Sequence, residues 1–367
     1  MNTASQDPQI ISPHGAGRGA HYITAQRAPG ESLETVLERA MAALRETGAT
    51  LVSMDILGIP MHPGLPAVER ITGPVAWPLT WIAAPRTGGA GGIQLWAESE
   101  AGVTPIRLRG QIAGSLVDTP HATIARLGGL TGRIPTRTEA EQTLAALHEF
   151  EDALHAAGMD FEHTVRTWYY NCDIVSWYND FNRARNEFFS EHRVYEGLLP
   201  ASTGIGACNV SGSSIVGGLI AVKPKSDAVT IAAVPSPLQG AATDYGSSFS
   251  RAAEINFPDA RLVFISGTAS IEPHGKTIHE NDIDGQIRRT MEVVAAILRS
   301  RHMDWAHVTR AIAYLKHPED CGRFEAYRRE HGLENLPIIT MTAEVCRDNL
   351  LFEMEADAAR VTNGNGA

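Results

Sequence analysis

The chain has 367 residues, of which 43% are hydrophobic and 20% are charged, a composition typical of a globular soluble protein. Its formal net charge of −11 argues against nucleic acid as the main partner, because binding to phosphate groups requires a basic surface. No run of about 18 apolar residues occurs, so we expect no membrane-spanning segment.

The two ends of the chain and its cysteines add further expectations. Residues 1–20 lack the charged start and the apolar stretch of a signal peptide, so we predict a flexible tail there and another at residues 361–367. The four cysteines have neither CxxC spacing nor the Cys/His spacing of zinc sites. We therefore expect a cytoplasmic protein with reduced thiols and no metal.

The first third of the chain predicts one small α+β unit, which we place at residues 21–103. The segment 33–56, LETVLERAMAALRETGATLVSMDI, has the periodicity of an amphipathic helix followed by a strand. The segment 77–99 contains two further strands after a proline. Between them, IPMHPGLPAVERITG (59–73) indicates that the unit has lost its second helix, so we describe it as degenerate.

The middle third, which we place at residues 104–225, matches the last third without a gap. Residues 148–171, HEFEDALHAAGMDFEHTVRTWYYN, align with residues 292–315, EVVAAILRSRHMDWAHVTRAIAYL. The alternative is a chance similarity between βαβ segments, but an ungapped Met-Asp-aromatic-x-His match favours duplication. The identical pairs are Met159 and Met303, Asp160 and Asp304, His163 and His307, Arg166 and Arg310, and Tyr170 and Tyr314.

The last third, residues 226–360, gives the clearest order of elements. RLVFISGTASI (261–271) predicts a buried strand, and residues 282–303 predict a helix with one apolar face. A strand, a short helix and two strands joined at residues 347–349 follow. Three units of the order β-α-β-α-β-β therefore predict an α+β fold triplicated within one chain, and the long period excludes a solenoid.

The segment 343–357, AEVCRDNLLFEMEAD, places several carboxylates on an apolar strand. Desolvation raises the pKa of a carboxyl group, which makes Glu353 a candidate acid. If Asp348 and Asn349 form a two-residue turn, Glu344 faces Glu353, and two like charges favour protonation of one of them. The alternative is a solvated strand face that Glu353 shares with Glu355, and periodicity alone favours that alternative.

Two of these segments resemble the RidA (YjgF) family, whose C-terminal signature is an arginine, a short turn and an apolar strand with Glu-x-Glu. They are FISGTAS (264–270) and VCRDNLLFEMEADA (345–358). RidA proteins have a chorismate-mutase-like fold and form homotrimers with active sites in the clefts between subunits. The resemblance therefore implies that the three units form a pseudo-trimer, and that the chain is a monomer or a homodimer.

A closer resemblance is to the chorismatases, a branch of this family that splits chorismate. RTWYYN (166–171), YNDFNRAR (178–185) and PASTGIGA (200–207) carry it, together with the two RidA-like segments. The resemblance implies cleavage of the enolpyruvyl ether of chorismate to pyruvate and a hydroxybenzoate, without a cofactor. Two other functions stay open: a RidA-type imine or enamine hydrolase, and a non-catalytic protein that binds a carboxylate.

The resemblance also implies roles for individual residues. Glu353 matches the acid, Gly267 and Cys346 match two positions that select the product, and their combination implies 3-hydroxybenzoate. The residues expected to bind the carboxylate substrate are the arginines Arg347, Arg166, Arg185 and Arg251 and the tyrosines Tyr170 and Tyr245. Residue-based alternatives are a solvated turn arginine for Arg347, a structural arginine of the repeat for Arg166, and an inert buried thiol for Cys346.

Two departures from the family pattern bear on the substrate. DYGSSFSRA (244–252) has no arginine between Gly246 and Phe249, and Ile312 occupies a position where the family can place a lysine. With fewer cations, a smaller or monoanionic relative of chorismate becomes an alternative substrate.

Overall fold

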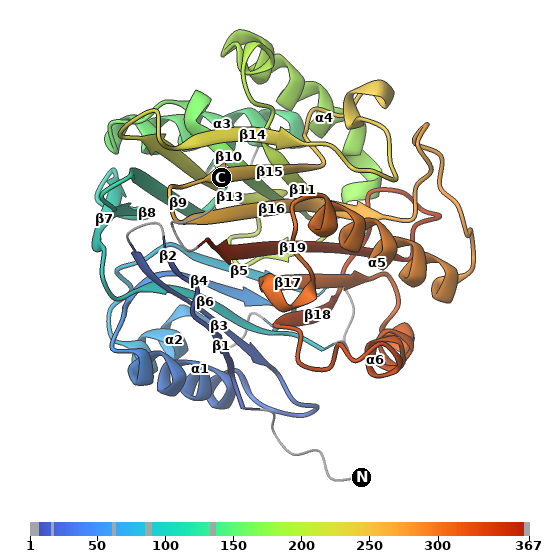
Figure 1. Ribbon diagram of the computed structural model, residues 1–367, viewed down its shortest axis with the longest axis horizontal. Helices are drawn as coiled ribbons and strands as arrows, with labels where there is room; N and C mark the ends of the chain where they lie inside the picture. Colours follow the sequence, from blue (N-terminus) through green and yellow to red (C-terminus); the bar gives the residue numbers. More distant parts are fainter. Residues whose placement is uncertain (1–6, 16–17, 61–63, 85–89, 133–136, 363–367) are drawn as a thin grey trace.

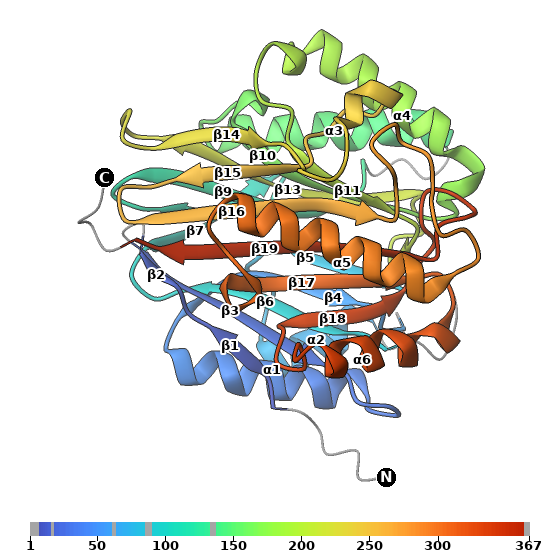
Figure 2. The same cartoon turned by 45° about the vertical axis from the view of Figure 1, so that its right-hand side comes forward.

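The computed structural model describes residues 7–15, 18–60, 64–84, 90–132 and 137–362, and these residues form three β-sheets. The helices lie on the outer surfaces and the sheets face one another in the middle of the molecule (Figure 1). Figure 2 shows the same layers from the side of α5. Across the described part of the chain, no helix combines the length and the apolar character needed to cross a membrane.

The second and third sheets have the same strand order, which confirms the predicted repeat. The second sheet has the order β11 (Ala201–Ile205), β10 (Thr164–Asn171), β13 (Ile215–Pro224), β9 (Ala122–Leu130), β8 (Gln111–Asp118) and β7 (Gly102–Leu108). The third has the order β18 (Ile338–Thr342), β17 (Val308–Leu315), β19 (Phe352–Val361), β16 (Ala260–Ala269), β15 (Ala252–Asn256) and β14 (Thr230–Val234). Their helices are α3 (Glu139–Ala156), α4 (Ile174–Glu191), α5 (Ile283–Ser300) and α6 (Cys321–Glu330).

The first sheet follows the same plan with changes at its edges. It has the order β1 (Gln9–Ile11), β3 (Arg18–Gln26), β6 (Gly92–Glu98), β4 (Thr50–Leu57), β5 (Leu79–Ala83) and β12 (Cys208–Asn209), and β2 (His14–Gly15) pairs with β3. Helix α1 (Leu33–Thr47) precedes β4, and α2 (Leu65–Thr72) follows it. The second helix is therefore shortened to eight residues rather than lost, with a proline in its first turn.

Part of the segment predicted as an N-terminal tail forms β-strands. Strands β1, β2 and the start of β3 occupy part of the segment 1–20, because the backbone there pairs with the first sheet. Residues 1–6 and 363–367 lie outside the described residues, and β19 ends at Val361.

The repeated Met-Asp-aromatic-x-His motif forms the same turn in both copies. The aspartate and histidine form a capping box around a 3-10 turn, Asp160 with His163 in η1 (Phe161–His163) and Asp304 with His307 in η4 (Trp305–His307). Each turn leads into a strand, β10 or β17. The remaining 3-10 turns are η2 (Val194–Glu196), η3 (Ala242–Tyr245) and η5 (Pro318–Asp320).

The prediction that the last two strands of a unit form a hairpin is wrong. Strand β18 pairs in parallel with β17, whereas β19 lies between β16 and β17 and runs antiparallel to both. Helix α6 connects the parallel strands β17 and β18, and the chain then crosses β17 to form β19. Glu353 consequently faces Ala269 and Tyr314, and not Glu344.

A disulfide joins Cys172, directly after β10, to Cys208 at the start of β12. The expectation of reduced thiols is therefore wrong for these two residues, and only Cys321 and Cys346 are free. The crosslink holds the end of the second unit's strand β10 beside a segment that pairs with β5 of the first sheet. Cysteine spacing did not indicate it, because a disulfide depends on proximity in the fold.

The apolar side chains form four cores. Three of them lie between one sheet and its own helices, one for each unit. The fourth lies in the middle and contains residues from all three sheets, including Val52, Trp168 and Ile312. The three units are thus packed on one another through a shared core, as the subunits of a trimer would be.

A buried polar cluster lies within this central core. Both carboxylate oxygens of Glu355 are bound: Oε2 accepts from Arg166 at 2.9 Å, and Oε1 accepts from Arg310 at 3.0 Å and from the Trp168 indole at 2.8 Å. The guanidinium groups of Arg126, Arg166 and Arg310 lie 4.6, 4.5 and 5.2 Å from the centre of the Trp168 ring. Cations over an indole face are stabilised by its quadrupole, so Trp168 organises the three arginines.

Glu355→Gln should destabilise the protein by about 3–5 kcal/mol, because it leaves two buried arginines without their shared counter-charge. Urea unfolding of the variant and the wild type measures this change. Glu38→Gln, on an exposed position of α1, is the control and should change stability by less than about 0.5 kcal/mol. Equal stabilities for the two variants would contradict the assigned role of Glu355.

Candidate active site

A cleft lies between the second and third units. Helix α4 and strand β11 form one wall, and β16, β19 and the loops before β15 and β19 form the other. The lining residues of the second unit are Tyr178, Phe181, Arg185, Ser202 and Gly204. Those of the third are Tyr245, Ser247, Phe249, Arg251, Gly267, Ala269, Ile271, Cys346, Arg347, Leu350 and Glu353.

Strand β11 is fixed to the third unit by hydrogen bonds from the PASTGIG segment. The Ser202 amide donates to Ser266 Oγ at 2.9 Å, and the Gly267 amide donates to Thr203 Oγ1 at 3.0 Å. Thr203 Oγ1 also accepts from Arg166 at 2.7 Å, which ties this wall of the cleft to the central cluster. The motif that carries the family resemblance is therefore a contact between two units.

Gly267 lies at a β-bulge in β16 and leaves space for the Glu353 carboxyl group. The pairing of β16 with β19 shifts between Ile265 and Thr268, so two residues of β16 oppose one of β19. A Cβ atom on Gly267 would lie only 2.1 Å from Glu353 Oε1 and 3.2 Å from Thr203. A glycine at this position is what allows the carboxyl group to lie against the β16 backbone.

Glu353 is buried, with 5% of its surface exposed, and is chemically different from its neighbour Glu355. Burial, with a smaller contribution from the Glu355 charge, raises the pKa of Glu353 to about 8. Glu353 therefore holds its proton at neutral pH, as expected for an acid catalyst. The cause differs from the sequence-based argument, because Glu355 rather than Glu344 supplies the like charge.

Glu355 faces the central core rather than the cleft. It is fully buried, and although burial alone would raise its pKa, Arg166 and Arg310 hold the pKa below the ordinary value. Arg166 is committed to this pairing, so the sequence-based assignment of Arg166 to substrate binding is not what the geometry favours. The alternative of a structural arginine of the repeat fits its place.

Three other arginines line the cleft: Arg185 from α4, Arg251 at the start of β15, and Arg347 from the loop before β19. The Nε atom of Arg185 and one terminal nitrogen of Arg251 are buried without a hydrogen-bond partner among the described residues. Buried donors normally have partners, so these two are available to an anionic ligand. Arg347 donates to the Gly275 carbonyl and lies over the Tyr245 ring.

The missing lysine at Ile312 has no bearing on this cleft. Ile312 is fully buried, faces Glu355 across the sheet, and belongs to the central core. The cleft keeps three cations without it.

The tyrosines and the cysteine divide between the cleft and the core. Tyr245 lines the cleft, whereas Tyr170 is buried in the central core, where burial raises its pKa. Cys346 lines the cleft beside Tyr178, and burial raises the pKa of its thiol to about 12, so it stays neutral. Tyr178 and Phe181 were not predicted as site residues. The signal was present, because they share one face of α4 with Arg185 at helical spacing.

The strand register identifies the counterparts of Glu353 in the other units. Glu353 opposes Tyr314, Val216 opposes Tyr170, and Gly92 opposes Leu57. By the same register, Gly218 and Gln94 are the counterparts of Glu355. Of these three equivalent positions, the one in the cleft between the second and third units carries a carboxyl group.

A second, small cavity lies in the central core. Its charged residues already bind one another, with Asp55 accepting from Arg126 at 3.0 Å and Asp357 accepting from Arg310 at 2.9 Å.

The described residues that line the inter-unit cleft include no histidine, and so they offer no typical metal ligand set. We therefore take the inter-unit cleft as the candidate active site.

Known proteins are similar to parts of this chain. Residues 244–360 match the family model described as Endoribonuclease L-PSP, which is the RidA family. The chain is 28% identical over 248 residues to 3-hydroxybenzoate synthase from Streptomyces hygroscopicus, an alignment that covers 61% of this chain and 71% of that protein. It is 27% identical over 221 residues to a chorismatase from Streptomyces rapamycinicus, covering 53% of this chain and 64% of that one, a little less than two thirds of its length.

The fold comparison extends over most of the molecule. A solved chorismatase structure superimposes with a TM-score of 0.63 at 20% sequence identity, covering 84% of this chain and 93% of that one. The three-unit fold of this chain is therefore that of the solved chorismatase. The relatives named above make the chain similar to the chorismatases of this family.

The raised pKa of Glu353 predicts a loss of stability as pH rises. Between pH 4.5 and about 8 the folded protein holds a proton that the unfolded chain releases, so unfolding becomes more favourable by about 1.4 kcal/mol per pH unit. Glu353→Gln should remove this dependence and become progressively more stable than the wild type across the range. Urea unfolding at several pH values measures the difference, with Glu38→Gln as the control. Parallel pH profiles for Glu353→Gln and the wild type would contradict the assignment.

Proposed function

We propose that the chain is a chorismatase-type enzyme that splits chorismate into pyruvate and a hydroxybenzoate. The observation that carries the proposal is a buried, protonated carboxyl group in a cleft with three arginines. Chorismate carries two carboxylates and an enol ether, so it needs both cationic groups and a proton donor. The curated relatives named 3-hydroxybenzoate synthase and chorismatase support the same reaction.

The proton of Glu353 is the starting point of the reaction. Transfer of this proton to the methylene carbon of the enolpyruvyl group converts its double bond into a methyl group and an oxocarbenium ion, and it leaves Glu353 as a carboxylate. A carboxylate in this buried position stabilises the cation that its own proton has created. The apolar walls from Phe181, Ile271 and Leu350 limit access of water to the cation.

The arginines account for the binding of a dicarboxylate. Arg185 lies on one wall, and Arg251 and Arg347 lie on the other, so two carboxylates at opposite ends of a ring can each meet a guanidinium group. A monoanionic substrate was an alternative because the sequence lacks two expected cations. With three arginines in the cleft, that alternative loses its support. The same arrangement also removes the main support for a non-catalytic descendant of the fold, and a 2-iminoacid, with one carboxylate, would leave cations unused.

We further propose 3-hydroxybenzoate as the aromatic product. In this branch the oxygen of the substrate's hydroxyl group attacks the neighbouring ring carbon as pyruvate leaves, and its own proton is lost. The resulting epoxide then opens by breaking the original C–O bond, and that ring carbon loses its proton, which makes the ring aromatic and leaves the hydroxyl group at the former ether carbon. The two products together contain all atoms of chorismate, so no water is consumed. Gly267 leaves room for the Glu353 carboxyl group, and burial keeps the Cys346 thiol neutral and therefore weakly nucleophilic.

The proposal includes the sequence-based expectations of a cytoplasmic location and of a monomer or homodimer. All three units come from one chain, so a homotrimer is not needed to form the cleft. The Cys172–Cys208 disulfide is the observation that speaks against a reducing compartment.

The direct test is incubation of the purified protein with chorismate alone, followed by mass spectrometry of the products. We expect pyruvate and 3-hydroxybenzoate, a rate that falls as pH rises through about 8, and loss of both products in Glu353→Gln. Glu344→Gln is the matched control, because Glu344 lies near the cleft but is not among its described lining residues, and it should retain activity. Absence of pyruvate at high enzyme concentration would refute the proposal, and release of ammonia from 2-iminoacids would favour the imine hydrolase.

Gly267→Ala tests the position of the carboxyl group. The added Cβ atom would displace Glu353 Oε1, so we expect the rate of pyruvate release to fall more than about tenfold and the fraction of 3-hydroxybenzoate to fall with it. The melting temperature should change little, because the clash involves the end of a flexible side chain. Wild-type rate and product ratio in this variant would show that Gly267 does not position Glu353.

A further inference from the structure

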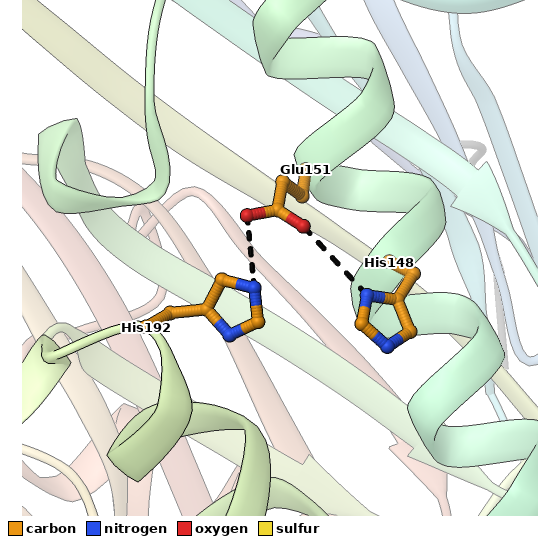
Figure 3. Close-up of side chains that lie close together, drawn as sticks. All are labelled: His148, Glu151 and His192. Carbon is orange, nitrogen blue, oxygen red and sulfur yellow. Dashed lines mark ion pairs between the residues drawn. The ribbon is translucent and has the colours of Figure 1, made fainter.

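Two histidines and a glutamate meet on the outer surface of the second unit, away from the cleft (Figure 3). His148 and Glu151 lie one turn apart on α3, and His192 is the residue that ends α4. Figure 3 shows the Glu151 carboxylate between the two imidazole rings, with one oxygen directed at each. The proposed reaction does not use these side chains.

The three side chains are spaced as ligands of one small cation would be. Glu151 Oε1 lies 3.0 Å from His192 Nε2, and Glu151 Oε2 lies 3.6 Å from His148 Nδ1. One ligand atom from each residue can be chosen so that all three lie within 4.8 Å of one another. Ligands of tetrahedral zinc, at about 2.0–2.1 Å from the metal, are ~3.4 Å apart, so small rotations of these side chains reach that geometry.

The His192 ring is held in one orientation with a defined use for each nitrogen. Its Nδ1 lies 2.9 Å from the Phe188 carbonyl, to which it donates, and the ring stacks on Phe188 with 3.8 Å between centroids. A neutral ring of this tautomer carries its lone pair on Nε2, which faces the Glu151 carboxylate. Two acceptors do not bind each other, so the gap between them requires either a second ring proton or a cation. A carbonyl that fixes the distal nitrogen is the usual outer partner of a metal-bound histidine.

We propose that His148, Glu151 and His192 bind one divalent transition-metal ion, of which Zn²⁺ is the best match. Two imidazole nitrogens and one carboxylate are the donors that zinc accepts, and water completes a tetrahedral set. His148 is about half exposed, with 53% of its side chain accessible, and so leaves a path for the ion to enter. The ion is separate from the catalytic cleft and takes no part in the proposed proton transfer.

The site would connect α3 to the end of α4. Helix α4 carries Tyr178, Phe181 and Arg185 into the cleft and is kinked near its start, where Trp177 departs from helical geometry. A metal bound between Glu151 and His192 would hold the far end of this helix against α3. The metal would thereby restrain one wall of the cleft from its outer side.

A second group, Asp160, Glu162 and His163, offers a matched comparison. Nδ1 of His163 lies 3.1 Å from the Asp160 amide, from which it accepts a hydrogen bond in the capping box. A neutral ring then carries its proton on Nε2, so His163 has no free lone pair for a metal unless the capping box opens. This group therefore serves as a control.

The test is calorimetric titration of the untagged, chelator-treated protein with Zn²⁺. We expect one ion per chain with micromolar or tighter affinity, and at least about tenfold weaker binding in Glu151→Gln and in His192→Gln. His148→Gln changes a half-exposed side chain and is the variant whose folding is safest. His163→Gln should bind zinc like the wild type. Substitution with Co²⁺ should give the intense visible absorption of a tetrahedral site, a readout independent of activity.

Two sets of results would overturn the proposal. Binding only at millimolar zinc, or equal affinity in the wild type and in Glu151→Gln, His192→Gln and His148→Gln, would show that these residues do not form a site. Hydrogen exchange of the backbone amides in the last turns of α4 tests the connection to the cleft: zinc should slow it in the wild type and not in His192→Gln. Unchanged exchange with bound zinc would refute the restraint on α4. None of these measurements depends on chorismate, so failure of the proposed function leaves them interpretable.

Discussion

The contact on which the structure depends most is the one between Glu355 and its three partners, Arg166, Arg310 and Trp168. It joins strands of two different units in the dry interior, where an unpaired charge would be very costly. Buried ion pairs contribute little net stability, but they permit few alternative arrangements. A shift of β19 by one residue would turn Glu355 away from both arginines. The cluster therefore fixes the register of the strand that carries the candidate catalytic residue.

The same strand places two carboxyl groups, two residues apart, in opposite protonation states. Glu355 meets two guanidinium groups and an indole and remains charged, whereas Glu353 lies in a dry cleft beside that charge and keeps its proton. Each state reinforces the other, because the fixed negative charge of Glu355 disfavours ionisation of Glu353. The hydrogen bond from the Gly267 amide to Thr203 fixes the bulge in β16 against which the protonated group lies. Acidity and position thus have one structural origin.

Much of the fold could be predicted from the sequence, because local periodicity and the ungapped match around Met159 and Met303 define elements and their repetition. The order of strands within a sheet could not, since a turn at Asp348 and Asn349 looks the same whether the next strand pairs with its predecessor or crosses to another neighbour. That non-local choice decided the partner of Glu353. Similarly, nothing in the motif around Arg166 distinguishes an arginine that meets a substrate from one that meets Glu355. Arg185 and Arg347 were predicted, whereas the disulfide and the role of Tyr178 depend on proximity between distant segments.

The counterparts of Glu355 in the other two sheets are Gly218 and Gln94. In a trimer of identical chains, a glutamate at this position would occur three times around the axis, and three carboxylates would meet in the interior. Linking the units in one polypeptide removes the symmetry that enforces such repetition. The equivalent positions can therefore hold a glutamate, a glutamine and a glycine. The centre of the molecule can therefore hold a number of charges of each kind that is not a multiple of three. The same asymmetry leaves one carboxyl group at the position of Glu353, whose counterparts in the other two sheets are Val216 and Gly92.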